Sequence, residues 1–313
     1  MAVAVYITFS SVLSHSFLSW DDPIYVTENP LIQDFSWQNI KKIFSTFVSG
    51  NYHPIPLLSH NIEYYFIKAD PYYYHLNNLA LHIINSLLVF FLVLKLSNNI
   101  FSAVITTLLF GIHPLRVESV AWIADRKDLL YGFFIICSMI SYLNYLSHNK
   151  IKYYNLTIAF FVFSLLSKAM ALAYPFILLL FDIYSGRRIN IRLFKDKIPF
   201  FIIALLFGVI ALYARGSYTD MLQESNFTLV ETLSLGTYRL IYYYLLRIFF
   251  PVGISLLYPY PNVEYPSIYL VCSSGILVVA LLLAIRFSLH KTKKIAFGLC
   301  FFFLFICPVL FVA

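Results

Sequence analysis

The sequence predicts an all-α protein, a polytopic transmembrane helical bundle of about nine or ten helices. Of the 313 residues, 60% are hydrophobic and only 12% are charged, and the mean hydropathy is +0.78. Soluble proteins carry roughly a quarter charged residues, so an ordinary soluble enzyme is excluded. The apolar residues form long blocks between short polar stretches, as membrane helices require, without the alternation of a β-barrel.

Ten apolar blocks account for most of the chain. Several are shorter than the roughly twenty residues that a perpendicular span needs, so we expect local bilayer thinning or helices that enter only partway. The block at 236–258 contains Arg239, Arg247 and Pro251, which favours a surface-lying or re-entrant segment and leaves about nine full crossings. The blocks are residues 1–18, 75–94, 100–112, 129–147, 153–167, 170–185, 198–213, 236–258, 266–289 and 295–313.

The whole chain, residues 1–313, is interpreted as a single transmembrane domain. Its first block lacks a basic leader region and a small-residue cleavage site, so we expect a retained helix rather than a signal peptide. The last block has no polar tail after it. We therefore expect the natural protein to continue beyond residue 313.

Basic clusters between the blocks predict the orientation of the chain. Lysine and arginine concentrate on the cytoplasmic side of a membrane, and they gather around Lys150, within 186–197 and around Lys293. The opposite, exported side then receives residues 19–74, 113–128 and 214–234. Because the basic residues lie mostly at block ends, the net charge of +7 reports membrane topology and argues against a nucleic-acid partner.

The exported loop 19–74 contains two segments with apolar residues on one helical face, Trp37–Val48 and His53–Ile67. Both are predicted to be amphipathic helices lying in the membrane plane. A long loop organised in this way is more typical of a reaction platform than of a transporter turn.

Two adjacent carboxylates, Asp21 and Asp22, follow Trp20 where the first helix meets the exported face. Carboxylates at a membrane boundary are costly to desolvate, which favours a bound cation, a proton-transfer role or a basic partner. The alternative is an exposed acidic loop that caps a helix. The residue pattern leaves both interpretations open.

The exported segment 113–128 carries Glu118, Trp122 and Asp125 at helical spacing, which predicts a short amphipathic helix on the membrane surface. Its basic residues are candidates for binding a lipid phosphate, because guanidinium and ammonium groups donate to phosphate oxygens. The alternative is that they snorkel to the interface. The candidates are Arg116, Arg126 and Lys127, joined by Lys168 at the exported end of another helix.

Four polar residues, His75, Asn78, His82 and Asn85, are spaced by three, four and three positions and so share one helical face. Polar groups inside a span face a cavity or another helix, which leaves a substrate pocket or interhelical hydrogen bonds. Two histidines without a carboxylate are a weak zinc signal, and the four cysteines show no metal-ligand spacing. We expect no organic cofactor, with a divalent metal as the remaining alternative.

Several of these residues belong to longer stretches that resemble a known family. The stretches are Trp20, Asp21, Asp22, Pro23, Ile24 and Tyr25, then Glu28, Asn29 and Pro30, then Tyr52, His53, Pro54 and Pro56, then Tyr74 and His75 with Asn78 and His82. The run from His113 to Asp128 is the most specific match, and Pro251, Val252 and Gly253 with Tyr258 and Pro259 continue it. Together they resemble bacterial glycosyltransferases of the GT-C type, which are similar to the animal transmembrane O-mannosyltransferases that target cadherins.

The resemblance implies a multi-pass membrane enzyme that takes a sugar from a polyprenyl-phosphate donor. Its site would face the periplasm across a bacterial inner membrane, or the lumen across an endoplasmic-reticulum membrane. A carboxylate of the first exported loop would act as the base, and the sugar would be transferred with inversion at its anomeric carbon. By its position, Asp21 is the expected base, and Asp22 would orient it or bind a cation. The two aspartates could also have the reverse roles. The expected donor-phosphate ligands are Arg116, Arg126, Lys127 and Lys168. The expected substrate-pocket residues are His53, His75, Asn78, His82, His113 and Glu118.

The implied partners are a polyprenyl-phosphate sugar, with mannose suggested by the animal relatives, a hydroxyl acceptor on exported protein or glycan, and membrane lipids. The family commonly carries tetratricopeptide repeats after its membrane part, and this sequence shows none. The rival hypothesis is a transporter or channel with an acidic cation-binding entrance, whose His and Asn face would line the path. A non-catalytic membrane scaffold is the third alternative, and it predicts that both aspartates are dispensable.

Overall fold

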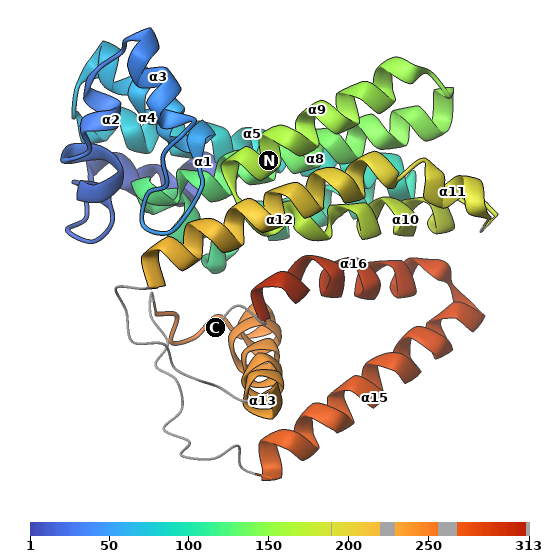
Figure 1. Ribbon diagram of the computed structural model, residues 1–313. Helices are drawn as coiled ribbons and strands as arrows, with labels where there is room; N and C mark the ends of the chain where they lie inside the picture. The colour runs from blue at the N-terminus through green and yellow to red at the C-terminus, as the bar shows by residue number, and fades with distance from the viewer. Residues whose placement is uncertain (189, 220–228, 256–267, 311–313) are drawn as a thin grey trace. The chain divides into compact units, whose positions relative to one another are not determined.

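The computed structural model describes residues 1–188, 190–219, 229–255 and 268–310. The chain divides into two compact units, which are described separately: unit 1 is Met1–Ala171 with Ile203–Leu222, and unit 2 is Leu172–Ile202 with Gln223–Ala313. Across the described ranges there is no β-strand, apart from an isolated bridge between Val48 and Asn51 (Figure 1). The predicted all-α class is confirmed.

Each of the ten predicted apolar blocks contains helix, although helical turns end at Ser14 in the first block and at Phe249 in the block 236–258. Residues 256–258, 266–267 and 311–313 of the last three blocks lie outside the described residues. Unit 1 contains α1 (Ala2–Phe9), α2 (Pro30–Gln33), α3 (Trp37–Ile43), α4 (Pro54–Ile67), α5 (Pro71–Ser97), α6 (Ile100–Ile112), α7 (Val117–Ala121), α8 (Arg126–His148), α9 (Ile151–Ser167) and most of α12 (Ile198–Thr219). Unit 2 contains α10 (Tyr174–Tyr184), α11 (Ile191–Lys195), α13 (Leu229–Arg239), α14 (Leu246–Phe249), α15 (Ile268–Lys291) and α16 (Lys293–Leu310). Short 3₁₀ segments are η1 (Ser10–Ser14), η3 (Pro114–Arg116), η4 (Ile123–Asp125) and η5 (Ala169–Ala173), and π-helical turns are η2 (Pro23–Thr27) and η6 (Leu240–Leu245).

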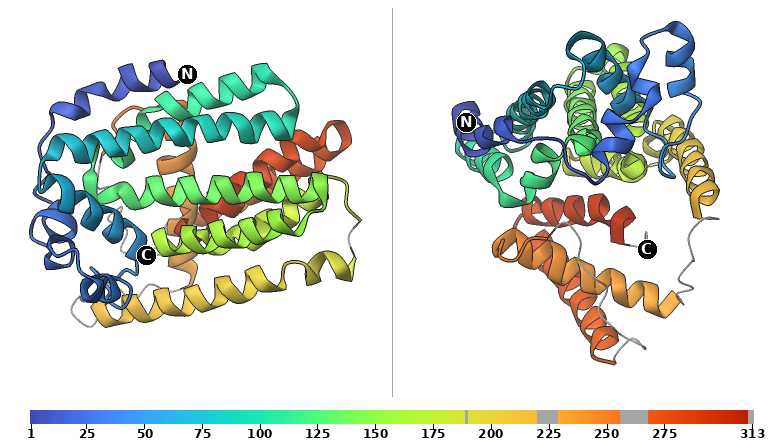
Figure 2. Two further views of the ribbon diagram at one scale, coloured as in Figure 1. Left: turned by 90° about the horizontal axis from the view of Figure 1, so that it is seen from above. Right: turned by 90° about the vertical axis from the view of Figure 1, so that its left-hand side faces the viewer.

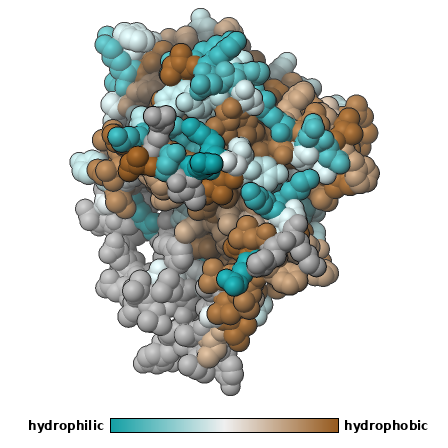
Figure 3. Space-filling view, turned by 90° about the vertical axis from the view of Figure 1, so that its right-hand side faces the viewer, coloured by the Kyte–Doolittle hydropathy of each residue, from teal (hydrophilic) through white to brown (hydrophobic). Residues whose placement is uncertain are grey.

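Two helical hairpins of unit 1, α5–α6 and α8–α9, each turn on an asparagine. Asn98 (φ 50°, ψ 34°) and Asn149 (φ 51°, ψ 33°) take the left-handed conformation, which asparagine tolerates better than most residues. Both turns lie at one end of unit 1, and α2, α3 and α4 lie at the other end (Figure 2). Figure 3 looks onto the end with the turns and shows hydrophilic side chains beside apolar ones.

Three helical stretches in the described part of the chain are long and apolar enough to cross a membrane: Pro71–Ser97, Ile123–His148 and Ile198–Gly216. The pair Ile100–Ile112 and Pro114–Ala121, bent by 56°, would make a fourth. These helices indicate a membrane protein. They are fewer than the roughly nine crossings predicted, because apolar blocks such as those of α6 and α10 form helices of only 13 and 11 residues. The larger number of crossings stays a prediction.

The loop at residues 19–74, which is predicted to be exported, contains a small helical platform, in which α3 and α4 correspond to the two predicted amphipathic helices. α3 ends at Ile43, earlier than predicted, whereas α4 ends at Ile67 as predicted. Its apolar core draws on several separate segments of unit 1. The buried members are Tyr25, Val26, Ile32, Ile43, Leu57, Tyr74, Trp122, Ile123 and Ala124. The platform is therefore packed directly against the segment that precedes α8.

The prediction of one amphipathic helix over 113–128 is wrong. The segment breaks into η3, α7 and η4, and its last residues begin α8. The break falls at Trp122, whose backbone is extended (φ −95°, ψ 116°). Trp122, Ile123 and Ala124 are buried in the platform core, so tertiary packing overrides the helical spacing. The predicted first helix likewise ends early, since its helical turns stop at Ser14.

In unit 2, aromatic side chains and an ion-pair network organise the described helices. Phe181 of α10 stacks on Phe297 of α16, with ring centroids 5.7 Å apart. Asp182 lies 2.6 Å from the Lys197 ammonium and 3.0 Å from the Arg187 guanidinium, and neither Asp182 nor Lys197 has exposed side-chain surface. This network ties α10 to the start of α12.

Candidate active site

Asp22 links the loop at residues 19–74 to residues 122–125, which lie between α7 and α8. Its Oδ1 accepts the backbone N–H of Ala124 at 2.8 Å, and its Oδ2 accepts the N–H of Leu18 at 2.8 Å. Asp22 is fully buried. Burial raises the pKa of its carboxyl above the ordinary value, while the two N–H donors act in the opposite direction.

Asp21 is the more accessible of the two adjacent carboxylates, being half-buried where Asp22 has no exposed surface. A general base must reach the hydroxyl proton that it removes. An accessible Asp21 beside a doubly hydrogen-bonded Asp22 therefore fits a base and its orienting neighbour. Both roles stay predictions.

Arg126, the first residue of α8, lies in a buried network and its side chain is 2% exposed. One terminal nitrogen donates to Glu63 Oε2, and Nε donates to Asn78 Oδ1 at 2.7 Å. The other terminal nitrogen donates to the carbonyl of Tyr74 at 3.0 Å. This interior position argues against the predicted contact of Arg126 with a donor phosphate.

Glu63 of α4 is a part of this network that the sequence analysis missed. Its Oε1 accepts the Asn77 amide at 2.6 Å, and His60 Nδ1 lies 3.7 Å from Oε2. Burial acts to raise the pKa of Glu63, but the contact with His60 and the charge and hydrogen bond of Arg126 outweigh it and lower the pKa overall. The sequence feature that could have identified Glu63 is its position three residues after His60, on the face of α4 that becomes buried.

Two of the predicted phosphate ligands, Lys127 and Lys168, lie in a lysine–carboxylate cluster with Asp125 and Asp128. The Lys127 ammonium is 3.1 Å from Asp125 Oδ1 and stands 5.4 Å above the Trp122 ring. Lys168 pairs with Asp128, and these two side chains are 22% and 30% exposed. Burial acts to lower the pKa of Lys168, but Asp128 and Asp125 raise it overall, so the ammonium stays charged.

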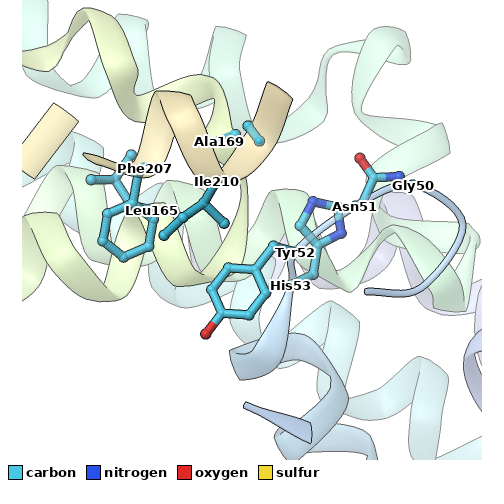
Figure 4. A pocket seen from close by; sticks show the side chains of 9 residues that line it. Gly50, Asn51, Tyr52, His53, Leu165, Ala169, Phe207 and Ile210 are labelled. Carbon is cyan, nitrogen blue, oxygen red and sulfur yellow. The ribbon is translucent and has the colours of Figure 1, made fainter. Parts of the chain in front are cut away.

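His53 lines a small cavity between the loop before α4 and the helices α9 and α12 (Figure 4). His53 is 5% exposed, and its Nδ1 has no hydrogen-bond partner. Burial, helped by the charges of Lys127 and Lys168, lowers the pKa of His53 to about 3, so the imidazole is neutral at pH 7. The cavity, of about 30 Å³, is large enough for a water molecule but too small for a sugar ring. It is lined by Gly50, Asn51, Tyr52, His53, Leu165, Ala169, Phe207, Ile210 and Ala211.

The polar face of α5 makes contacts between helices. Asn78 accepts from Arg126 and donates to the Trp122 carbonyl at 3.3 Å. His82 Nε2 lies 2.8 Å from the Gly111 carbonyl of α6, and the His75 ring packs edge-on against His15 at 6.0 Å. Of the two interpretations left open, these contacts favour interhelical packing over a substrate pocket.

The remaining predicted residues, Arg116, His113 and Glu118, do not form a single group. The Arg116 guanidinium stands 5.1 Å above the Phe110 ring, and His113 Nδ1 accepts the Leu115 N–H at 3.2 Å and so caps η3. Glu118 is exposed, and its charged neighbours are the four members of the lysine–carboxylate cluster.

Within the described residues, no group of three His, Cys, Asp or Glu side chains is placed to hold a metal ion. The Asp22 carboxylate accepts from backbone N–H groups, and those of Asp125 and Asp128 pair with lysines. The chemistry that these side chains can supply is proton acceptance by Asp21 and stabilisation of an anion by Lys127 and Lys168.

No family model and no solved structure matches the chain. Parts of it are similar to animal proteins named as protein O-mannosyl-transferases. The human protein TMTC3 is 34% identical over 92 residues, which are 29% of this chain and 10% of that protein. The Xenopus laevis protein tmtc2 is 26% identical over 265 residues, which are 76% of this chain and 31% of that protein. The chain thus spans between about a tenth and a third of the length of these curated relatives.

Proposed function

We propose that this chain forms the membrane part of a glycosyltransferase of the GT-C type. The enzyme transfers a sugar from a polyprenyl-phosphate donor to a Ser or Thr hydroxyl of an exported protein. Mannose is the proposed sugar because the similar animal proteins are named protein O-mannosyl-transferases. The proposed site faces the periplasm of a bacterium, or the lumen of the endoplasmic reticulum in a eukaryote, and the chain crosses the membrane several times.

One observation carries the assignment of the site: the hydrogen bond between Asp22 and Ala124. It brings the accessible carboxylate of Asp21 to the segment that carries Lys127, three residues after Ala124. Lys127 in turn shares the neighbour Asp125 with Lys168. An acceptor for a proton and two charges for a departing phosphate therefore belong to one region of unit 1, which supports a transfer reaction.

In the proposed reaction, Asp21 takes the proton of the acceptor hydroxyl as the hydroxyl oxygen attacks the anomeric carbon with inversion. The bond between the anomeric carbon and the phosphate oxygen breaks, and polyprenyl phosphate leaves. Lys127 and Lys168, with Arg116 as a third candidate, stabilise the negative charge that develops on the phosphate. Asp22 orients the loop that carries Asp21.

One of the predicted pocket residues, the exposed Glu118, remains a proposed contact of the substrate, because its charged neighbours include Lys127, Lys168 and Asp128. His53 shares these neighbours, but it lines a cavity too small for a sugar ring and is not proposed as a contact. We expect no organic cofactor, and a requirement for a divalent metal is decided by running the assay below with and without a chelator.

The test is transfer of radiolabelled sugar from a panel of polyprenyl-phosphate sugars to exported proteins, in membranes that contain the chain. Wild type is compared with Asp21→Asn and Asp22→Asn. The matched control is Glu28→Gln, which neutralises an exposed carboxylate of the same loop. Membrane insertion and thermal unfolding are measured for every variant.

We expect Asp21→Asn to abolish transfer while the protein stays inserted and folded, and Glu28→Gln to transfer as wild type does. Transfer that survives in both aspartate variants would exclude the carboxylate mechanism. A wild-type chain that transfers no sugar but moves a cation or solute across vesicles would instead support the transporter hypothesis.

A further inference from the structure

Arg126 occupies a position that neither phosphate binding nor ordinary packing explains. It begins α8, yet it is among the largest fully buried side chains in the described part of the protein. Each of its three guanidinium nitrogens donates to a protein acceptor, on Glu63, Asn78 and Tyr74. A guanidinium held at every nitrogen has a fixed position and orientation.

The partner side of this interaction is equally constrained. Both carboxylate oxygens of Glu63 accept, one from Arg126 and one from Asn77. Tyr74 lies under the Arg126 guanidinium at 5.5 Å and stacks on His60 at 5.7 Å. The ion pair therefore connects α4 of the platform, the start of α5 and the start of α8.

The position of Arg126 determines where its chain neighbours lie. Two residues before it, Ala124 donates to Asp22, and Trp122 accepts from Asn78, which also accepts from Arg126. One residue after it, Lys127 enters the lysine–carboxylate cluster. A shift of Arg126 would move the Asp22 contact and Lys127 together.

We propose that Glu63 and Arg126 are a positioning pair, which fixes the spacing between the Asp21–Asp22 carboxylates and Lys127. The catalytic consequence of this proposal rests on the proposed function. The pair does not touch donor or acceptor; it sets the distance between the group that takes the proton and a group that stabilises the phosphate. Positional errors of this kind lower the rate of transfer without weakening donor binding in proportion.

The test uses the full chain in detergent or nanodiscs with Arg126→Lys, which keeps the charge and loses the three-way donor geometry, and Glu63→Gln, which keeps the shape and loses the charge. The matched controls are Arg187→Lys in unit 2 and Glu28→Gln in the exposed part of the loop. Two experiments are run on folded, monodisperse protein. Steady-state kinetics gives kcat and KM for the polyprenyl-phosphate sugar, and amide hydrogen exchange is followed in peptides that cover residues 16–26 and 120–128.

We expect Arg126→Lys to lower kcat at least tenfold, to change the donor KM less than about twofold, and to increase exchange in both peptides. Glu63→Gln should act in the same direction, and both controls should match wild type. A raised donor KM with unchanged kcat would instead make Arg126 a phosphate ligand and overturn the proposal. Unchanged kcat and unchanged exchange in folded Arg126→Lys would also overturn it.

Hydrogen exchange separates this proposal from the proposed function. If wild type transfers no sugar from any donor, the enzyme assignment fails. Hydrogen exchange would still show whether the Glu63–Arg126 pair protects the backbone amides of residues 16–26 and 120–128. Increased exchange at residues 16–26, far from Arg126 in sequence, would then support the positioning pair, and exchange confined to 120–128 would refute it.

Discussion

Asp22 accepts the backbone N–H of Ala124, 102 positions away, with a carboxylate that has no exposed surface. The adjacent Asp21 stays accessible. Two neighbouring aspartates thus have different surroundings, and the physical difference lies in hydrogen bonding and burial rather than in sequence position.

Asp22→Asn should destabilise the protein, whereas Asp21→Asn should not. The side-chain amide of the Asp22→Asn variant would have one oxygen and one N–H₂ group in place of two oxygens. One of the two backbone N–H donors, that of Leu18 or that of Ala124, would then lose its acceptor. We expect the free energy of unfolding to fall by about 1–3 kcal/mol, measured by denaturant unfolding in detergent with Glu28→Gln as control. Equal stability of the Asp21 and Asp22 variants would contradict the structural role of Asp22.

Lys168→Gln should impair transfer with little effect on folding. The Lys168–Asp128 pair is partly exposed, so its loss should cost less than about 1 kcal/mol of stability. Loss of a cation beside a departing phosphate should lower kcat/KM by about 10²-fold. The control is Lys150→Gln, which removes an exposed lysine at the N-terminal end of α9, whereas Lys168 lies at the C-terminal end of that helix. Equal transfer by the two variants would remove Lys168 from the site.

His60 should make the protein less stable as the pH falls below neutrality. Burial, with the charge of Arg126, lowers the pKa of His60 from 6.5 to about 4. Between these values the unfolded chain binds a proton that the folded chain does not, so the stabilisation is complete above pH 6.5 and is lost as the pH falls toward about 4. The loss should be on the order of 2 kcal/mol by about pH 5, since one pKa unit corresponds to about 1.4 kcal/mol.

The measurement for His60 is unfolding free energy against pH for wild type and His60→Phe. Phenylalanine retains the stacking on Tyr74 and removes the titrating group. His53 contributes in the same direction in both proteins, so the difference between the two curves reports the titration of His60 together with its effect on the Glu63 carboxyl. Parallel curves between pH 6.5 and about 4 would show that His60 does not titrate in this way.

Asp182→Ala should destabilise unit 2 more than Lys197→Met does. Asp182→Ala removes the carboxylate next to the fully buried ammonium of Lys197. Breaking a buried ion pair by removing one partner lowers the free energy of unfolding by about 3–5 kcal/mol. Removing Lys197 leaves Asp182 with the Arg187 guanidinium at 3.0 Å, which compensates part of the loss. Denaturant unfolding of both variants tests this order, and a larger effect of Lys197→Met would reverse the assignment of Arg187 as the second partner.

Local pattern predicted the helices of this protein well, but not every break between them. Long apolar blocks mark helices because backbone groups away from water must bond within the segment, and α5 and α8 follow such blocks closely. The amphipathic spacing of His53–Ile67 predicted α4 equally well. The break at Trp122 was not visible, because Glu118, Trp122 and Asp125 have true helical spacing. The chain leaves the helix there since Trp122 and its two successors fill the platform core.

For the site, the sequence singled out the side chains but not their partners. Asp21, Asp22, Lys127 and Lys168 were recognisable as unusual charges near apolar blocks. The partners could not be predicted, because they are distant in sequence. Asp22 and Ala124 are 102 positions apart, and Arg126 and Glu63 are 63 positions apart. Local periodicity does not encode contacts over such separations.

The sequence by itself determined the class of this protein: an all-α chain with apolar helices, polar connections and a small set of charges at the helix ends. These properties follow from composition and local spacing, because hydrogen bonding within a helix and transfer of apolar side chains from water depend on near neighbours. Only the tertiary structure decided which charges are buried and which stay accessible. Burial and ion pairing depend on segments that meet after folding, and they separate Asp21 from Asp22 and Arg126 from Lys127.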